Sequence, residues 1–192
     1  AKLIGPIDGT PHSLLIASSE APVGRHKKNM VLLNDSTCQT ARFHGAFNLE
    51  GGRGWTLGRL TSPDNAEPPP IFLNENELEV GEQALLGDGD RLSFSTNVSF
   101  GVRKPQPESA TIEIYCEELP GEDEHLRNVI RWTLLDEKTL VGGSPECHTY
   151  LTEFEYPLFS ISYEGGLFWL VQAKSSTSLN MSVGWNPVRL PC

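Results

Sequence analysis

A short segment of the sequence occurs twice, and this repetition constrains the fold more than any other feature. Residues 50–57 read E-G-G-R-G-W-T-L and residues 164–171 read E-G-G-L-F-W-L-V, so E-G-G-x-x-W recurs at an offset of 114 residues. Self-similarity at such a spacing indicates duplicated structural units. Each copy is predicted to be a β-hairpin, because Gly-Gly supplies the positive φ of a tight turn. Trp55 and Trp169 would then begin the second strand of each hairpin, with their rings against the core.

The surroundings of the two segments also correspond. A valine followed by glycine precedes each copy, at residues 23–24 and at residues 141–143, with an offset of 118. An apolar strand is predicted further upstream in each half, at residues 2–4 and 111–114. The stretch 106–109, flanked by Pro105 and Pro107, is the natural linker. These observations predict two domains, residues 1–106 and residues 107–192.

Both halves are predicted to be all-β. The 18 glycines and 14 prolines are spread between short apolar runs, which is typical of many turns joining brief strands. Helical spacing is weak, whereas apolar residues alternate with polar ones in several stretches, as expected for half-buried strands. The alternating positions are Ile112, Ile114 and Cys116; Phe159, Ile161 and Tyr163; and Leu179, Met181, Val183 and Trp185.

Five motifs follow one another in the first half. They are Val23-Gly24-Arg25, Ala41-Arg42-Phe43-His44, Ser62-Pro63-Asp64-Asn65, Leu73-Asn74 and the stretch 86–92, L-G-D-G-D-R-L. In this order they resemble the motifs of the forkhead-associated (FHA) domain family, over roughly residues 1–106. The resemblance implies a β-sandwich whose loops at one end bind phosphothreonine peptides. The chain as a whole is therefore predicted to be two tandem FHA-like β-sandwich domains, the second divergent and incomplete.

The resemblance also implies which residues would form the binding site. Candidate phosphopeptide ligands are Arg25, Arg42, Ser62, Asn65 and Asn74, and the residues implied to support the site are Gly24 and His44. A guanidinium can hold two phosphate oxygens at once, which makes Arg25 the first candidate donor, although it could equally be a surface arginine without a ligand. His44 is expected to be structural, bridging loops behind the site, rather than catalytic or metal-binding. Residues 26–28, His-Lys-Lys, add local positive charge to an acidic chain.

Two departures from the family pattern weaken the case for phosphate. Ala41 stands where the family has a serine whose hydroxyl binds the phosphate, and losing one charge-assisted hydrogen bond costs about 1.5–3 kcal/mol. Thr40 is adjacent, but strand alternation would point it to the opposite face. Ser62 and Asn65 depart by one residue from the family spacing, and Ala66 replaces a glycine.

The second half has lost the cations of the first. The two offsets place Gly143 opposite Arg25, Tyr156 opposite Arg42 and Leu158 opposite His44. We therefore expect this half not to bind phosphate. It has no counterpart of the stretch 86–94, so its last strands are predicted to be absent or supplied by another segment.

Several other functions are disfavoured. The net charge of −10 opposes binding to nucleic acid or to an anionic membrane. The sequence lacks a G-x-S-x-G elbow and a P-loop, and Cys147, His148 and His125 do not have metal-ligand spacing. No cofactor, metal or catalytic residue is predicted. The four cysteines are widely spaced, which favours an intracellular, reducing setting, and the chain is expected to be a soluble portion of a larger or membrane-associated protein.

Two functions remain, both non-enzymatic and both with a protein partner. The first hypothesis is a scaffold or assembly domain that works independently of phosphorylation, as FHA-like domains of secretion machinery do. The second is a regulatory signalling adaptor that binds a phosphothreonine segment through the first domain. The loss of phosphate ligands in both halves favours the scaffold.

Overall fold

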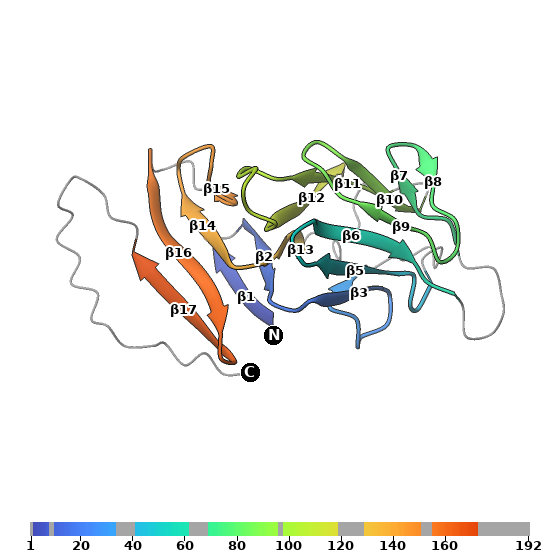
Figure 1. Ribbon diagram of the computed structural model, residues 1–192, viewed down its shortest axis with the longest axis horizontal. Helices are drawn as coiled ribbons and strands as arrows, with labels where there is room; N and C mark the ends of the chain where they lie inside the picture. The colour runs from blue at the N-terminus through green and yellow to red at the C-terminus, as the bar shows by residue number, and fades with distance from the viewer. Residues whose placement is uncertain are drawn as a thin grey trace.

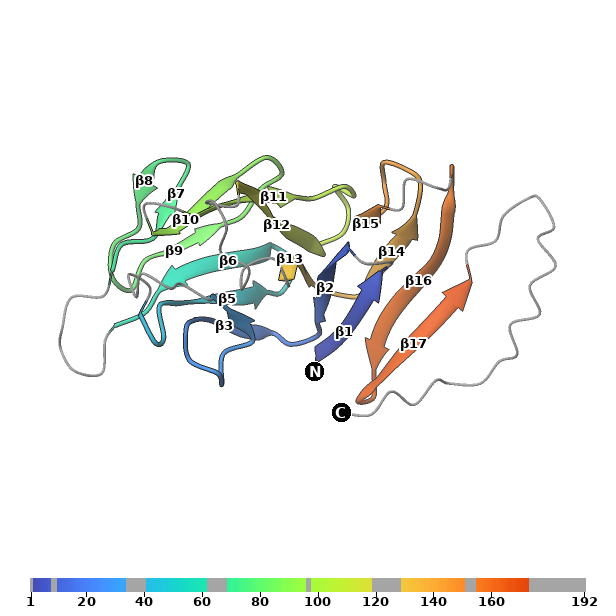
Figure 2. The same cartoon turned by 180° about the vertical axis from the view of Figure 1, so that it is seen from behind.

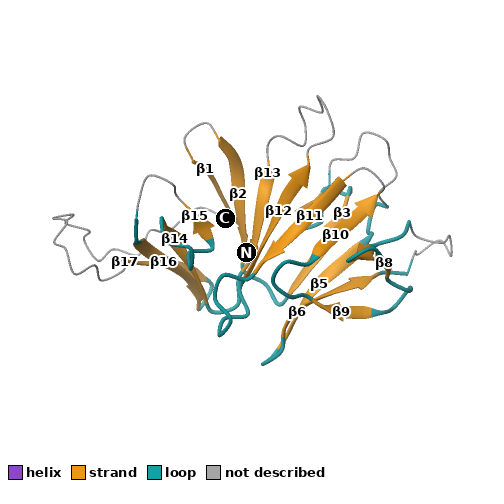
Figure 3. Cartoon of the chain, turned by 90° about the horizontal axis from the view of Figure 1, so that it is seen from above, coloured by secondary structure: helices purple, strands orange, loops and turns teal. Residues whose placement is uncertain are grey.

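The structure is a computed structural model that describes residues 2–7, 10–33, 41–61, 69–95, 98–118, 129–150 and 155–172. Every regular element in these ranges is a β-strand, as Figure 3 shows. The predicted all-β class is confirmed. The alternating segment predicted at residues 179–185 lies outside the described residues. In the described part of the chain, no helix is long and apolar enough to cross a membrane.

The strands follow one another along the chain. Their bounds are β1 (Lys2–Ile7), β2 (Thr10–Ile16), β3 (Glu20–Gly24), β4 (Val31–Leu32), β5 (Gly45–Glu50), β6 (Gly54–Arg59), β7 (Phe72–Leu73), β8 (Asn76–Glu77), β9 (Gln83–Leu85), β10 (Arg91–Ser95), β11 (Val98–Arg103), β12 (Ile112–Glu118), β13 (Val129–Leu134), β14 (Lys138–Gly142), β15 (Thr149–Tyr150), β16 (Pro157–Glu164) and β17 (Leu167–Gln172).

These strands form three sheets (Figure 1). The five-stranded sheet has the order β4-β3-β5-β6-β9, and the four-stranded sheet has the order β15-β14-β16-β17. The eight-stranded sheet has the order β1-β2-β13-β12-β11-β10-β7-β8. The eight-stranded sheet therefore contains strands from both halves of the sequence.

The five-stranded and eight-stranded sheets enclose the main core and form a β-sandwich. Trp55 and Phe47 from the five-stranded sheet are fully buried there, and Phe94 and Phe100 meet edge to face at 5.8 Å from the other side. Strands β12 and β13 add four buried side chains to the same core, namely Ile112, Ile114, Trp132 and Leu134. The boundary predicted after residue 106 therefore falls inside one continuous sheet, between β11 and β12.

Two hairpins lie side by side in the eight-stranded sheet, β1–β2 from the first half and β12–β13 from the second. Strand β2 pairs with β13 in parallel, and Trp132 lies opposite Leu14, Thr133 opposite Leu15 and Leu134 opposite Ile16. Each of these pairs is separated by 118 residues, the offset found in the sequence between the two valine-glycine motifs. The hairpin β12–β13 thus stands between β11 and the hairpin of the first half.

The four-stranded sheet lies beside the β1–β2 end of the eight-stranded sheet, at the far end of the molecule from the five-stranded sheet, as Figures 2 and 3 show. Successive residues of a strand point to opposite faces. Accordingly, Ile16 on β2 belongs to the main core, whereas its neighbours Leu15 and Ala17 belong to a second, smaller core. Ile161, Tyr163 and Phe168 of the four-stranded sheet pack against that smaller core. The eight-stranded sheet therefore contributes to two cores, one on each face, at its β1–β2 end.

The four-stranded sheet has the same strand order as part of the five-stranded sheet. The orders β15-β14-β16-β17 and β4-β3-β5-β6 correspond strand by strand. Their hairpins differ, because Glu50 pairs with Gly54 but Glu164 pairs with Leu167, which makes the second turn one residue shorter. Trp55 is consequently buried, whereas Trp169 is 40% exposed. The prediction that the ring of Trp169 faces the core is wrong.

Candidate functional site

The loops that carry the predicted cations lie against each other at one end of the five-stranded sheet. Strand β3 ends at Gly24, and the following loop leads to β4; residues 41–44 lead into β5. The backbone amide of Arg25 donates to the carbonyl of Ala41 at 3.1 Å, and the amide of His26 donates to the carbonyl of Arg42 at 3.1 Å. These two bonds bring together the motifs of Arg25 and Arg42, which are far apart in the sequence.

Gly24 allows this close approach of the two loops. Its φ is +150°, and a Cβ at this position would lie 2.6 Å from the carbonyl oxygen of Arg42 and 2.9 Å from that of Ala41. Any side chain would therefore push the loops apart and strain the backbone. The position implied to support the site is thus one where only glycine fits.

Asn29 and His44 hold the loops from behind. Asn29 is buried, and its Nδ2 donates to the Arg42 carbonyl at 2.7 Å. His44 is fully buried, with its Nε2 2.8 Å from the carbonyl oxygen of Pro69, while its backbone amide donates to Val23. The ring of His44 therefore bridges to the segment that precedes β7, as a structural residue would. Asn29 was not among the predicted residues, and an asparagine in a polar loop gave no distinguishing signal.

Exposed positive charge gathers at these loops. Arg25, Lys27, Lys28 and Arg42 are all exposed. The ring of His26 lies against that of Phe43, with centroids 5.1 Å apart. Partial burial, together with the charges of Arg42, Lys28 and Lys27, lowers the pKa of His26 below its usual value. The imidazole is therefore neutral near pH 7, and its Nδ1 accepts a hydrogen bond from the amide of Lys28 at 3.3 Å.

The fixed donors that would suit a phosphate dianion are largely committed to the loop itself. The amides of Arg25, His26, Lys28 and Asn29 all donate to atoms of the two loops. Ala41 contributes no hydroxyl. A ligand would thus meet exposed side-chain cations rather than a preorganised cradle of amides and hydroxyls.

Asn74, another predicted ligand, is bonded within the protein. Asn74 has a positive φ of 51° in the turn between β7 and β8. Its Nδ2 donates to Asp90 at 2.8 Å, and its Oδ1 accepts from the amide of Arg91 at 2.9 Å. The side chain of Asn74 therefore joins two turns of the protein. Ser62 and Asn65 lie outside the described residues, as does Thr40.

The corresponding loops of the four-stranded sheet keep the backbone geometry without the charge. Gly142 has a φ of +157°, and a Cβ there would lie 2.5 Å from the carbonyl oxygen of Tyr156. The amide of Gly143 donates to the same carbonyl at 3.1 Å. Gly143 stands where the first half has Arg25, and the buried Cys147 stands where it has Asn29. This end of the second half offers no equivalent cations among its described residues.

Other parts of the described structure do not present a competing site. Among those residues no group of three or more metal-ligating side chains occurs. A cavity of about 380 Å³ is lined by Arg59, Glu77, Glu79 and Val80. The nearly buried guanidinium of Arg59 lies 2.6 Å from the carboxylate of Glu77 and donates to the carbonyl of Leu78 at 3.0 Å. This arrangement joins β6 to β8.

Comparisons with known proteins give structural similarity only. No protein-family model matches the sequence, and no curated protein matches it significantly. Among solved structures, Mycobacterium tuberculosis EmbR in complex with a low-affinity phosphopeptide has a TM-score of 0.38 and 15% identity, over 52% of this chain and 23% of that one. The N-terminal FHA domain of S. cerevisiae Rad53p, in complex with a phosphothreonine peptide, has a TM-score of 0.34 and 20% identity, over 43% of this chain and 64% of that one.

A third similar structure is the FHA-2 domain of an ABC transporter from M. tuberculosis, with a TM-score of 0.37 and 18% identity, over 54% of this chain and 78% of that one. The match thus spans less than two thirds of EmbR and of the Rad53p domain.

Proposed function

We propose that this chain is a non-enzymatic protein-interaction module whose first half holds an acidic segment of a partner protein, without requiring phosphate. The observation that carries the proposal is the group of four exposed cations, Arg25, Lys27, Lys28 and Arg42, on two hydrogen-bonded loops. The remainder of a chain with a net charge of −10 repels acidic ligands, so these loops set the orientation of such a segment.

The chemistry of the loops favours carboxylates over a phosphate dianion. Phosphate recognition draws its strength from fixed donors at short range, and four amides of the loops are already bonded within the protein. The alanine at position 41 removes a further donor. Several carboxylates spread along an extended segment match the spread of exposed cations on the two loops, which needs no such cradle.

A phosphothreonine adaptor is the second candidate function. It is favoured by the hydrogen bonds that place the Arg25 and Arg42 motifs side by side, as the sequence resemblance implies. Both candidates share a protein partner and the same loops, and they differ only in whether the partner must be phosphorylated. We further propose an intracellular setting, in keeping with free thiols at Cys116 and Cys147.

The two candidates are separated by titrating three peptides of one sequence, with threonine, phosphothreonine or glutamate at the central position among flanking acidic residues. The proposal expects the three affinities to agree within about threefold and to fall together as salt is raised. Arg42→Ala should weaken all three. Arg53→Ala is the matched control, because Arg53 is an exposed arginine on the β5–β6 hairpin, paired only with Glu50 at 3.6 Å.

Binding of the phosphothreonine peptide alone, abolished by Arg42→Ala, would replace the proposal with the adaptor. Failure of all three peptides to bind at low salt would reject both candidates at these loops.

A further inference from the structure

An exposed aromatic side chain stands among the cations of the two loops. Phe43 is 38% exposed, although it lies between Arg42 and the fully buried His44. In the described part of the first half, the other large apolar side chains with comparable exposure are Val80 and Leu85, which lie on or beside β9. Phe43 is thus the exposed apolar residue of the cationic loops.

The backbone that carries Phe43 is held firmly on both sides. The carbonyl of Arg42 accepts from the amide of His26 at 3.1 Å and from Asn29 Nδ2 at 2.7 Å. On the other side, the amide of His44 donates to Val23 at 2.9 Å, and the amide of Leu60 donates to the carbonyl of His44 at 3.2 Å. A phenyl ring on a fixed backbone loses little conformational entropy when a ligand covers it.

His26 completes a small apolar surface beside Phe43. The two rings meet at 5.1 Å with an angle of 39° between their planes. The imidazole is hydrogen-bonded to the Lys28 amide through Nδ1, which fixes its orientation. The pair therefore presents two neighbouring ring surfaces, and the exposed cations Lys27, Lys28 and Arg42 belong to the same two loops.

We propose that His26 and Phe43 form an apolar contact site for a leucine-like or aromatic side chain that neighbours the acidic residues of the partner segment. This inference rests on the proposed function, since it assumes that an acidic segment occupies the loops. An aromatic anchor surrounded by charges is the arrangement in which a few residues dominate a protein interface. The cations attract the segment, and the ring pair selects which acidic segment is retained.

The inference predicts a sequence preference that charge alone would not produce. Two peptides with identical acidic residues, one carrying leucine and the other serine beside them, are titrated against the full chain. The wild type should bind the leucine peptide about tenfold more tightly, as expected for covering a leucine side chain. Phe43→Ser should bring the two affinities together, and Arg42→Ala should weaken both peptides while preserving their ratio.

Leu85→Ser is the matched control, because it removes an exposed apolar side chain on β9 and should leave the ratio unchanged. Phe43→Trp provides a second measurement that does not depend on the stability of the serine variant: its additional fluorescence should shift to the blue with the leucine peptide and not with the serine peptide.

The possible failures are distinguishable. Equal affinity of the wild type for both peptides, or a preference that survives Phe43→Ser, would overturn this inference and leave the proposed function intact. Failure of both peptides to bind would overturn the proposed function itself.

Discussion

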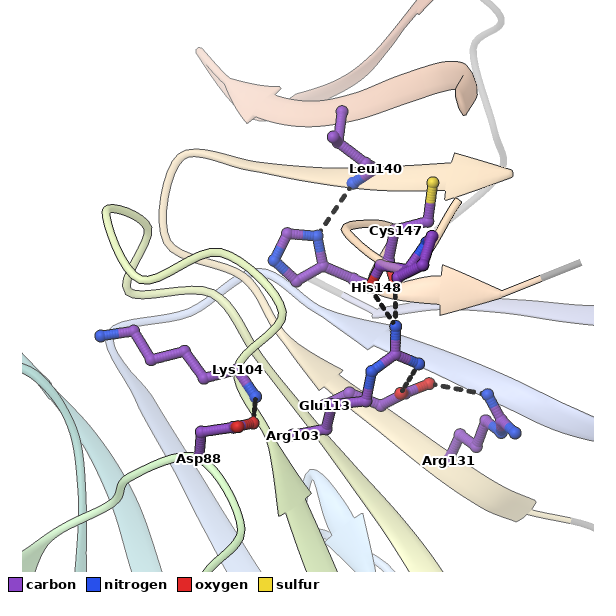
Figure 4. Close-up of polar contacts among 9 residues, drawn as sticks. Asp88, Arg103, Lys104, Glu113, Arg131, Leu140, Cys147 and His148 are labelled. Carbon is purple, nitrogen blue, oxygen red and sulfur yellow. Dashed lines mark hydrogen bonds and ion pairs between the residues drawn. The ribbon is translucent and has the colours of Figure 1, made fainter. Parts of the chain in front are cut away.

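The guanidinium of Arg103 on β11 donates a hydrogen bond to the backbone carbonyl of Cys147, a residue 44 positions later in the loop before β15. The same side chain donates to the carbonyl of Pro145 at 3.0 Å and lies 3.4 Å from the carboxylate of Glu113 (Figure 4). Arg131 lies on the other oxygen of Glu113, at 3.1 Å. These contacts fasten the four-stranded sheet to the eight-stranded sheet with polar bonds beside the small second core.

Replacing Arg103 by methionine should therefore weaken the attachment of the four-stranded sheet. The variant loses the bonds to two carbonyls and leaves the buried Glu113 with one cation, so we expect a loss of about 2–4 kcal/mol in the free energy of unfolding. Chemical denaturation followed by circular dichroism measures the change. Lys138→Met is the control, since Lys138 is exposed and joins its neighbours through its backbone. A loss as small as that of the control would show that the bonds are not stabilising.

His148 should make stability fall in mild acid. Burial first, and the charge of Arg103 second, lower the pKa of His148 to about 4, whereas the unfolded chain titrates near 6.5. The unfolded state therefore binds the proton more readily, and stability declines by about 1.4 kcal/mol per pH unit from pH 6.5 towards pH 4. Between pH 6.5 and pH 4, the unfolding free energy of the wild type should fall by this amount per pH unit relative to that of His148→Leu, in unfolding measured at several pH values.

Glu113 changes stability with pH in the opposite direction. The effect of His148 is therefore read from the difference in unfolding free energy between the wild type and His148→Leu at each pH. Burial raises the pKa of Glu113 in spite of Arg131 and Arg103, and its protonation favours the folded state as the pH falls. If the unfolding free energies of the wild type and His148→Leu changed with pH in the same way, the imidazole of His148 would not be buried in its neutral form.

Gly24→Ala should disturb the cationic loops. The added Cβ would lie 2.6 Å from the carbonyl oxygen of Arg42 at a φ of +150°, and we expect a cost of about 2 kcal/mol or more. Amide exchange of residues 25–29 should rise together with the loss of stability. Gly51→Ala is the control, because no atom lies within 4 Å of a Cβ there. If Gly24→Ala lost no more stability than Gly51→Ala, the loops would be able to accommodate a side chain at position 24.

Cutting the chain at the predicted domain boundary should not release a folded first domain. A fragment of residues 1–106 lacks Ile112, Ile114, Trp132 and Leu134, all of which are buried in the main core. We expect that fragment to bind a hydrophobic dye and to unfold without a cooperative transition, whereas residues 1–136 retain this core and unfold cooperatively. Equal cooperativity of the two fragments would show that the hairpin β12–β13 is dispensable.

The two tryptophans of the repeated segment should differ sharply in their contribution to stability. Trp55 is fully buried, whereas Trp169 is 40% exposed with its Nε1 bonded to the carbonyl of Glu164 at 3.2 Å. Trp55→Ala should cost about 3–5 kcal/mol and Trp169→Ala about 0.5 kcal/mol or less. Thermal unfolding of both variants checks this, and a large loss at Trp169 would contradict the shorter turn.

The sequence predicted local structure well because alternation and turn residues act over a few positions. Ile112 and Ile114 point to one face of β12 as expected, and Phe159 to Tyr163 lie in β16. The orientation of Trp169 was missed because it depends on whether the turn after Glu164 contains two residues or three. Four identical letters in six positions do not determine that number, and a change of one residue reverses the face.

The sequence alone could not show which strands pair with each other. The order of the predicted elements is compatible with two separate sandwiches. No local feature of the β12 sequence indicates that this strand pairs with β11, from which residues 104–111 separate it. At the site, the sequence identified the neighbouring Arg25 and Arg42 motifs, but not Asn29 behind them or the use of Asn74 between two turns. Such roles arise from loop packing, which leaves no periodic signal. The duplication itself stays a prediction, favoured by the shared strand order of two sheets.

The hairpin β12–β13 constrains how the two halves of this chain can change over evolutionary time. One face supplies Ile112, Ile114, Trp132 and Leu134 to the interior of the first sandwich, and on the other face Glu113 bonds to Arg103, which holds the loop before β15. Substitutions there are therefore restricted on both faces at once. Mutations should accordingly remove ligand-binding charges from the second half long before they alter β12 and β13, which complete the core of the first half.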